Sequence, residues 1–167
     1  MMPVDPVHHA FAAVADGRTR LLVLGSLPGR QSLAAGRYYA HPQNQFWRLM
    51  SPVAGVDLAA LDYAARLQAL LAAGIGLWDV VGSARRQGSL DAAMRDVAPR
   101  DLKVAIAGLP ALRALAFNGA AALAIGQRQL GADAGVALVA LPSSSAAHAI
   151  GVAAKQPAWN RLSAYLG

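Results

Sequence analysis

Four short apolar runs, each ending in a cluster of glycine, proline or polar residues, constrain the fold of this chain more than any other feature. They alternate with segments whose apolar residues recur at helical spacing, such as "LAALDYAARLQALLAA" before Gly74. Strands that alternate with helices form βαβ units, in which a mostly parallel sheet is covered on both faces. The sequence therefore predicts an α/β fold with four strands, at 20–25, 74–82, 112–119 and 136–144, and helices at 4–16, 44–53, 58–73, 100–107, 120–130 and 157–166.

The length and the absence of cysteine narrow the class of protein further. A chain of 167 residues is long enough to bury a core without metals or disulfides, so we expect one domain over residues 1–167. With no cysteine, iron–sulfur clusters and thiol nucleophiles are excluded. No apolar run approaches the roughly 20 residues that span a bilayer, and no leader pattern opens the chain. We therefore expect a cytoplasmic protein without a membrane partner.

The polar clusters that end the four predicted strands are "GSLPG", "WDVVGS", "FNG" and "LPSSS". In a parallel sheet the carboxyl ends of the strands meet at one edge, where open α/β folds bind ligands. Each cluster alone is ordinary turn chemistry. Together they predict one pocket built from four separate stretches of sequence.

The charge of the chain suggests a class of partner. Its 15 Lys and Arg residues against nine acidic residues leave a net charge of +6. A basic balance favours polyanions such as nucleic acid, because neutralising phosphates releases condensed counterions. A solvated arginine-rich surface explains the same composition without a ligand.

The ordered motifs "GSLPG", "YYAHPQNQFW", "GIGLWD", "FNG" and "LPSSSAAHA" resemble those of the uracil-DNA glycosylase superfamily, over about residues 20–151. The combination of "HPxNxFW" with a late "PSSSA" is more specific than "GxxPG" alone. "GSLPG" together with "GSLD" at 88–91 is similar to the hypoxanthine-DNA and mismatch-specific branch. The resemblance implies a three-layer α/β/α sandwich that excises a deaminated base from DNA. Hydrolysis of an N-glycosidic bond requires no metal or organic cofactor, so we expect none, and we expect a monomer.

One position departs from the mismatch-specific relatives. They carry Asn or Asp at the third position of "GxxPG", where it handles the attacking water, whereas this chain has Leu27. The resemblance then implies Asn44 as the catalytic residue, because its amide can bind a water and donate to the departing base. An amide is too weak a base to remove a proton, so we expect positioning. Asn44 as the cap of the following helix is the alternative.

The resemblance also implies how the base is bound. Tyr39 stands where relatives place an aromatic ring against the flipped base. An ionised Asp79 accepts hydrogen bonds only, so it can recognise the N1–H of hypoxanthine, which adenine lacks, and would tolerate the N3–H of uracil. Asn118 is a second candidate reader. Caps and turns are the alternatives for both residues. The loop that contributes backbone N–H groups consists of Gly25, Ser26, Leu27, Pro28 and Gly29.

The last motif is expected to hold the DNA backbone. Small hydroxyl residues there, Ser143, Ser144 and Ser145, can donate to phosphates. Relatives with strong uracil activity carry a His at the position of Ser143. Ala147 and His148 occupy the region of the wedge that fills the vacated base stack, although His148 also fits an ordinary surface loop. Four arginines are expected to line the approach of the DNA: Arg30, Arg37, Arg85 and Arg86.

Three functions follow from these residues. The first is a monofunctional DNA glycosylase for hypoxanthine, with uracil or xanthine as further substrates. The second is an inactive module that binds damaged DNA, which fits Leu27 and the missing His at Ser143. The third, a domain that binds small nucleotides, is disfavoured because neither GxGxxG nor GxxxxGK[ST] follows a strand. We expect no metal site, since the adjacent His8 and His9 diverge on a helix.

Overall fold

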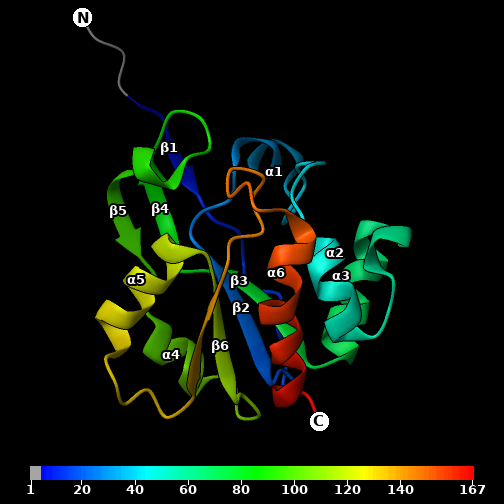
Figure 1. Ribbon diagram of the computed structural model, residues 1–167. Helices are drawn as coiled ribbons and strands as arrows, with labels where there is room; N and C mark the ends of the chain where they lie inside the picture. Colours follow the sequence, from blue (N-terminus) through cyan, green and yellow to red (C-terminus); the bar gives the residue numbers. More distant parts are fainter. Residues whose placement is uncertain (1–4) are drawn as a thin grey trace, which may run out of the picture.

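The computed structural model describes residues 5–167. Its centre is a sheet of four strands in the order β3-β2-β6-β7, and every neighbouring pair is parallel (Figure 1). The strands are β2 (Leu21–Gly25), β3 (Ile75–Asp79), β6 (Ala114–Asn118) and β7 (Ala137–Leu141). The predicted parallel sheet is therefore confirmed.

Helices cover both faces of this sheet, because alternate residues of a strand point to opposite sides. Leu21 and Val23 pack against α2 (Phe46–Ala54), α3 (Tyr63–Ala72) and α6 (Gly151–Asn160). Leu22 and Leu24 pack against α4 (Leu102–Ala107) and α5 (Ala120–Leu130) on the other side (Figure 1). The three-layer α/β/α arrangement is confirmed.

A second sheet was not predicted. It is antiparallel in the order β1-β4-β5, from β1 (Val7–His9), β4 (Val81–Arg85) and β5 (Arg95–Pro99). The predicted helix at 4–16 is wrong for the described residues, and residue 4 lies outside them. The segment pairs its backbone with β4 and, through Val14, with Leu77 of β3, so long-range hydrogen bonds replace helical ones.

Several element boundaries also differ from the prediction. The predicted strand at 74–82 is two strands, since the chain turns after Asp79 into β4. The predicted helix at 58–73 is a 3-10 turn, η1 (Leu58–Ala60), followed by α3 with Asp62 as its cap. The predicted last helix begins earlier, as α6, and ends in η3 (Arg161–Tyr165). Two short elements that were not predicted are α1 (Arg30–Ala35) and η2 (Asp91–Ala93).

The carboxyl ends of the four parallel strands lie next to one another. Gly25 of β2 is in register with Asp79 of β3, and Asn118 of β6 is in register with Leu141 of β7. This edge is where the polar clusters were expected to converge. No helix within residues 5–167 is long and apolar enough to cross a membrane.

Candidate active site

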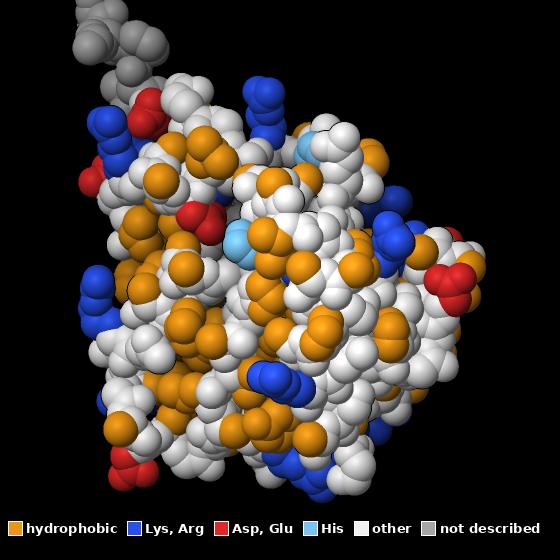
Figure 2. Space-filling model, viewed as in Figure 1, with side chains coloured by type: hydrophobic (Ala, Val, Ile, Leu, Met, Phe, Trp, Pro, Cys, Tyr) orange, Lys and Arg blue, Asp and Glu red, His pale blue; other side chains and the backbone are white. Residues whose placement is uncertain are grey.

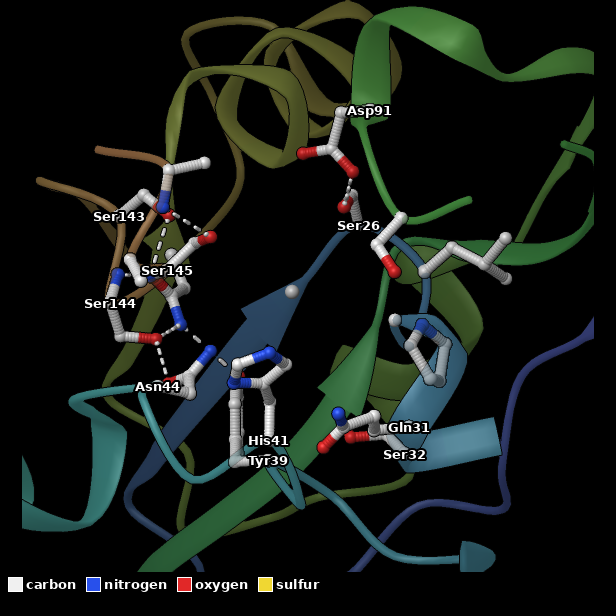
Figure 3. Close-up of a pocket in the computed structure, with 18 of the residues that line it drawn as sticks. Ser26, Gln31, Ser32, Tyr39, His41, Asn44, Asp91, Ser143, Ser144 and Ser145 are labelled. Atoms are coloured by element: carbon white, nitrogen blue, oxygen red, sulfur yellow. Dashed lines mark hydrogen bonds between the residues drawn. The ribbon is translucent and has the colours of Figure 1, made fainter. Parts of the chain in front are cut away.

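A pocket of about 520 Å³ opens at the carboxyl edge of the parallel sheet. It is lined by the loop after β2, the loop before α2, the ends of β3 and β6, the loop after β7 and residues 89–91 (Figure 3). Of the cluster "WDVVGS" only Asp79 reaches it, because the following residues enter β4. The structure brings together every predicted site residue: Gly25, Ser26, Leu27, Pro28, Gly29, Tyr39, Asn44, Asp79, Asn118, Ser143, Ser144, Ser145, Ala147 and His148.

The amide oxygen of Asn44 is held by two donors. Oδ1 accepts from the backbone N–H of Phe46 at 3.0 Å and from the hydroxyl of Ser144 at 2.8 Å. Because a backbone N–H can only donate, the atom that faces it must be the oxygen. The NH2 group of Asn44 has no hydrogen-bond partner within residues 5–167, and the residue lines the pocket. Asn44 thus ties down the start of α2 through its oxygen and leaves its donors free.

Asn118 and Ser144 support Asn44 from behind. Ser144 donates its backbone N–H to Asn118 Oδ1 at 2.8 Å, which fixes the orientation of the second amide. Asn118 Nδ2 then donates to the Ser144 hydroxyl at 2.9 Å. That hydroxyl in turn donates to Asn44 Oδ1 (Figure 3). These three side chains form the amide cluster, in which every polar group except the NH2 group of Asn44 takes part in a hydrogen bond.

The amide cluster uses groups that were predicted to touch DNA. The Ser144 side chain belongs to a residue only 1% exposed, so its hydroxyl is not available to a phosphate. The second amide hydrogen of Asn118 goes to the Tyr39 hydroxyl at 3.3 Å, so no N–H of Asn118 remains for a base. Ser143 and Ser145 are partly exposed and remain the predicted phosphate contacts.

Tyr39 is held in an unusual backbone conformation. Its φ of 54° lies in the left-handed region, which a bulky residue adopts only when its surroundings impose it. Its carbonyl accepts from the Trp47 indole N–H at 3.1 Å, and its ring stacks on Phe46 with the centroids 3.9 Å apart. One face of the ring is therefore covered, and only the other face can meet a base. Burial raises the pKa of the Tyr39 phenol, and Asp79 raises it further.

Asp79 differs from the amide cluster because part of it has no partner. The residue is 4% exposed, and its Oδ2 makes no hydrogen bond within the described residues. Burial raises the pKa of its carboxyl group to about 7, although the positive charge of Arg100 lowers it. A Cβ atom on Gly25 would lie 2.7 Å from Asp79 Oδ1, so glycine is required beside this carboxyl. A buried polar atom without a partner is costly unless a ligand supplies one.

The connection between β4 and β5 forms a pocket wall that the sequence did not predict. Ser26 donates from its hydroxyl to Asp91 Oδ1 at 2.5 Å (Figure 3). The Arg30 backbone N–H donates to Ser89 Oγ at 2.9 Å. Arg86 was expected on the DNA approach, but it is fully buried and donates to the carbonyls of Pro28 and Ser89. The sequence holds no signal for the contacts to Ser26, Pro28 and Arg30, because each of them joins residues about sixty positions apart.

The other predicted basic contacts are distributed around the molecule. Arg30 lines the pocket, Arg37 lies 5.4 Å from the centre of the Tyr63 ring, and Arg85 pairs with Asp96 at 3.2 Å. Figure 2 shows Lys and Arg side chains scattered over this face rather than gathered in one patch. Among residues 5–167, no three His, Asp or Glu side chains lie close enough together to hold a metal ion.

Comparisons with known proteins agree with this arrangement. Residues 11–163 match the family model of the uracil DNA glycosylase superfamily. A hypoxanthine DNA glycosylase of Methanosarcina barkeri is 40% identical over 109 residues, which are 65% of this chain and 69% of that protein. A hypoxanthine DNA glycosylase of Methanosarcina acetivorans is 38% identical over 113 residues, 68% of this chain and 72% of that protein.

A solved structure shares the fold as well. It is a solution NMR structure from Methanosarcina acetivorans, provisionally assigned as a uracil DNA glycosylase. It superimposes with a TM-score of 0.86 at 34% identity and covers 96% of this chain and 99% of its own. Fold, motif order and family match point to one conclusion: the chain belongs to the uracil DNA glycosylase superfamily, whose members are DNA N-glycosylases.

Proposed function

We propose that this protein is a monofunctional DNA glycosylase that excises hypoxanthine from DNA, with no covalent enzyme intermediate. The observation that carries the proposal is the state of Asn44, whose oxygen is locked by two donors while its NH2 group is left free at the pocket. Two relatives named hypoxanthine DNA glycosylase support the choice of base. Uracil and xanthine are further candidate substrates, because both also present a ring N–H beside a carbonyl.

The pocket suits a planar base that has left the helix. Its volume of about 520 Å³ lies in the usual range for small-molecule sites, and an enzyme that acts on a base must first extrude it. The open face of Tyr39 can stack on the base, and backbone N–H groups of residues 25–29 can donate to its edge. Asp79 Oδ2, which has no partner, accepts from the N1–H of hypoxanthine when the carboxyl is ionised. Adenine carries no hydrogen at N1, so this contact separates the deaminated base from its parent.

The reaction breaks the bond between C1′ of the sugar and N9 of the base. The electron pair of that bond leaves with the base, and a positive charge develops on the sugar. Donors that already point at the departing anion lower the barrier without reorganising. The NH2 group of Asn44 takes this role, while a water attacks C1′ and its proton ends on the released base. Since an amide oxygen with two donors has no basic function, Asn44 acts by hydrogen bonding and not as a general base.

The remaining surfaces would hold the DNA. Ser143 and Ser145 are partly exposed at the pocket rim and can donate to phosphates, and Ala147 and His148 lie beside them. Arg30 adds a positive charge on the same rim. We further propose that residues 1–167 act as one domain and as a monomer, because the pocket is complete within one chain.

An inactive module that binds damaged DNA is the competing function. Leu27, at the position where some relatives carry a polar residue, is a buried apolar side chain in the pocket wall. This side chain can neither hold nor activate a water. If catalysis depends on that position alone, the protein binds a flipped base but does not release it.

A strand-cleavage assay separates the two functions. End-labelled DNA carrying a single hypoxanthine, uracil, xanthine or normal base is incubated with the protein, and abasic sites are then cleaved with alkali. We expect cleavage at hypoxanthine, none at the normal base, and no cleavage without alkali, since the enzyme is monofunctional. Binding to the hypoxanthine duplex without any alkali-labile product would identify the inactive module instead.

A further inference from the structure

We propose that Leu90 inserts into the DNA base stack and fills the space left by the extruded nucleotide. This inference rests on the proposed function, because it concerns how the same pocket engages duplex DNA. It assigns a role to Leu90 of "GSLD" (88–91), a motif in the connection between β4 and β5 that the sequence analysis used only to choose the branch of the family.

Leu90 is a large apolar side chain exposed at the edge of the pocket. It is 63% exposed and lines the pocket together with its neighbours Ser89 and Asp91. A single exposed leucine has no meaning by itself, since much of any protein surface is apolar. Its position at the opening where DNA must dock is what makes this leucine informative.

The backbone that carries Leu90 is tied down on both sides. Ser89 accepts from the Arg30 backbone N–H at 2.9 Å, and Asp91 accepts from the Ser26 hydroxyl at 2.5 Å. Arg86, fully buried, donates to the Ser89 carbonyl at 3.4 Å and to the carbonyl of Pro28. Leu90 is thus an exposed side chain on a backbone fixed to the loop at 25–29. A group held in this way loses little conformational entropy when it inserts.

The residues that line the opposite rim of the pocket include no large apolar side chain, and the one large side chain there, His148, is polar. Residues 143–148 are three serines, two alanines and a histidine. Extruding a nucleotide leaves a gap of the size of a base, and proteins fill such gaps with wedges such as Leu, Ile, Met or Phe. Ala147 is too small to fill it, whereas Leu90 has the volume. We therefore move the expected wedge from residues 147–148 to Leu90, and keep Ser143 and Ser145 as the expected contacts to the DNA backbone.

The test compares Leu90→Ala with Val104→Ala in single-turnover excision. Val104 is 67% exposed on α4 and does not line the pocket, so it controls for loss of an exposed apolar side chain. Each protein is assayed on a hypoxanthine duplex and on the same strand without its complement. We expect Leu90→Ala to lower the duplex rate at least about tenfold and the single-strand rate less than about twofold, since a single strand has no stack to refill. Val104→Ala should change neither rate.

Two outcomes overturn the proposal: an unchanged duplex rate, or an equal loss on duplex and single strand, which would place Leu90 in base binding. A second measurement keeps the proposal testable if the parent protein excises no base. Affinity is then measured for a duplex with a tetrahydrofuran abasic-site analogue, in which the gap is already present. Leu90→Ala should bind this duplex about tenfold more weakly than the parent and Val104→Ala equally well. Equal affinity of all three proteins would reject insertion by Leu90 independently of catalysis.

Discussion

Two parts of the pocket, the amide cluster and Asp79, differ in whether their polar side-chain atoms have hydrogen-bond partners within the protein. In the amide cluster, the oxygens of Asn44 and Asn118 each meet a backbone N–H, and the Ser144 hydroxyl lies between the two amides. At the end of strand β3, Asp79 is buried more deeply than either amide, yet its Oδ2 has no partner within the described residues. The difference separates a hydrogen-bonded support, in which only the NH2 group of Asn44 is left free, from a carboxyl oxygen that is left for a ligand.

The largest effect is expected for Asp79, whose Oδ2 has no hydrogen-bond partner within the described residues. In the variant Asp79→Asn, the unfolding free energy should depend less on pH than in the parent protein. The pKa of Asp79 is raised from 3.8 to about 7, so the folded protein binds a proton on the Asp79 carboxyl group more tightly than the unfolded chain does. The associated stability is fully present below pH 3.8 and is lost as the pH rises through 7. Over that range the parent should lose about 4 kcal/mol of unfolding free energy relative to the variant, which cannot ionise.

Urea unfolding of both proteins at pH 4, 5.5, 7 and 8.5 measures this difference. At pH 4 the two should be nearly equal, because an amide has the shape of a protonated carboxyl. Above pH 7 the variant should be the more stable protein. A difference that stays constant with pH would mean that Asp79 is partnered or solvated and would remove the contrast with the amide cluster.

The second largest effect is expected when a hydrogen bond of the amide cluster is removed. Ser144→Ala removes the hydroxyl between Asn44 and Asn118 and leaves each amide with one bond fewer inside the protein. We expect a loss of about 1–3 kcal/mol of unfolding free energy. Single-turnover excision should also fall about tenfold, because the orientation of Asn44 is then less restricted. Ser143→Ala is the matched control for stability, and its cost in unfolding free energy should be small, since its hydroxyl accepts only from a nearby backbone N–H. Equal losses of unfolding free energy in both variants would show that the cluster has no special role.

The smallest effect is expected from Tyr39→Phe. The variant keeps the ring that stacks on Phe46 and removes only the hydroxyl that accepts from Asn118 at 3.3 Å. We expect less than about 1 kcal/mol of lost stability and an excision rate within about threefold of the parent. A loss of a hundredfold or more would instead make the phenol a direct participant in the reaction.

The parts of this site that could be predicted are those set by the direction of the strands. Gly25, Asp79 and Asn118 each end a parallel strand, so their meeting at one edge follows from the alternation of strands and helices. The three consecutive serines could not be told apart, since only the fold buries Ser144 and leaves its neighbours partly exposed. The buried state of Arg86 depends on its contact with Pro28, 58 positions earlier in the chain.

The prediction of a helix in the N-terminal segment was wrong for a related reason. Residues 5–16 contain enough apolar residues to suggest a helix, but β4 of the antiparallel sheet and β3 at the edge of the parallel sheet offer their backbone groups to this segment. Once those long-range hydrogen bonds form, local propensity no longer decides the structure. The same antiparallel sheet carries the connection that holds Leu90, so the part of the fold that was missed also contains the part of the site that was missed.

We propose that the side-chain oxygen of Asn44 only holds the residue in place, whereas its NH2 group donates to the departing base. Two variants separate these roles. Asn44→Ala removes both, so it should lower the single-turnover excision rate by about 10²-fold and cost about 1 kcal/mol of stability through the lost hydrogen bonds to Phe46 and Ser144. Asn44→Asp keeps an oxygen for Phe46 and Ser144 but replaces the NH2 group with a second oxygen.

The most direct measurement is therefore the excision rate of Asn44→Asp on a hypoxanthine duplex, compared with its unfolding free energy at the same pH. We expect Asn44→Asp to be about as stable as the parent protein. Its excision rate should be reduced as far as that of Asn44→Ala, because the donors to the departing base are gone. A folded Asn44→Asp protein that excises hypoxanthine at the parental rate would contradict the account, because the NH2 group could then not be the group that works on the base.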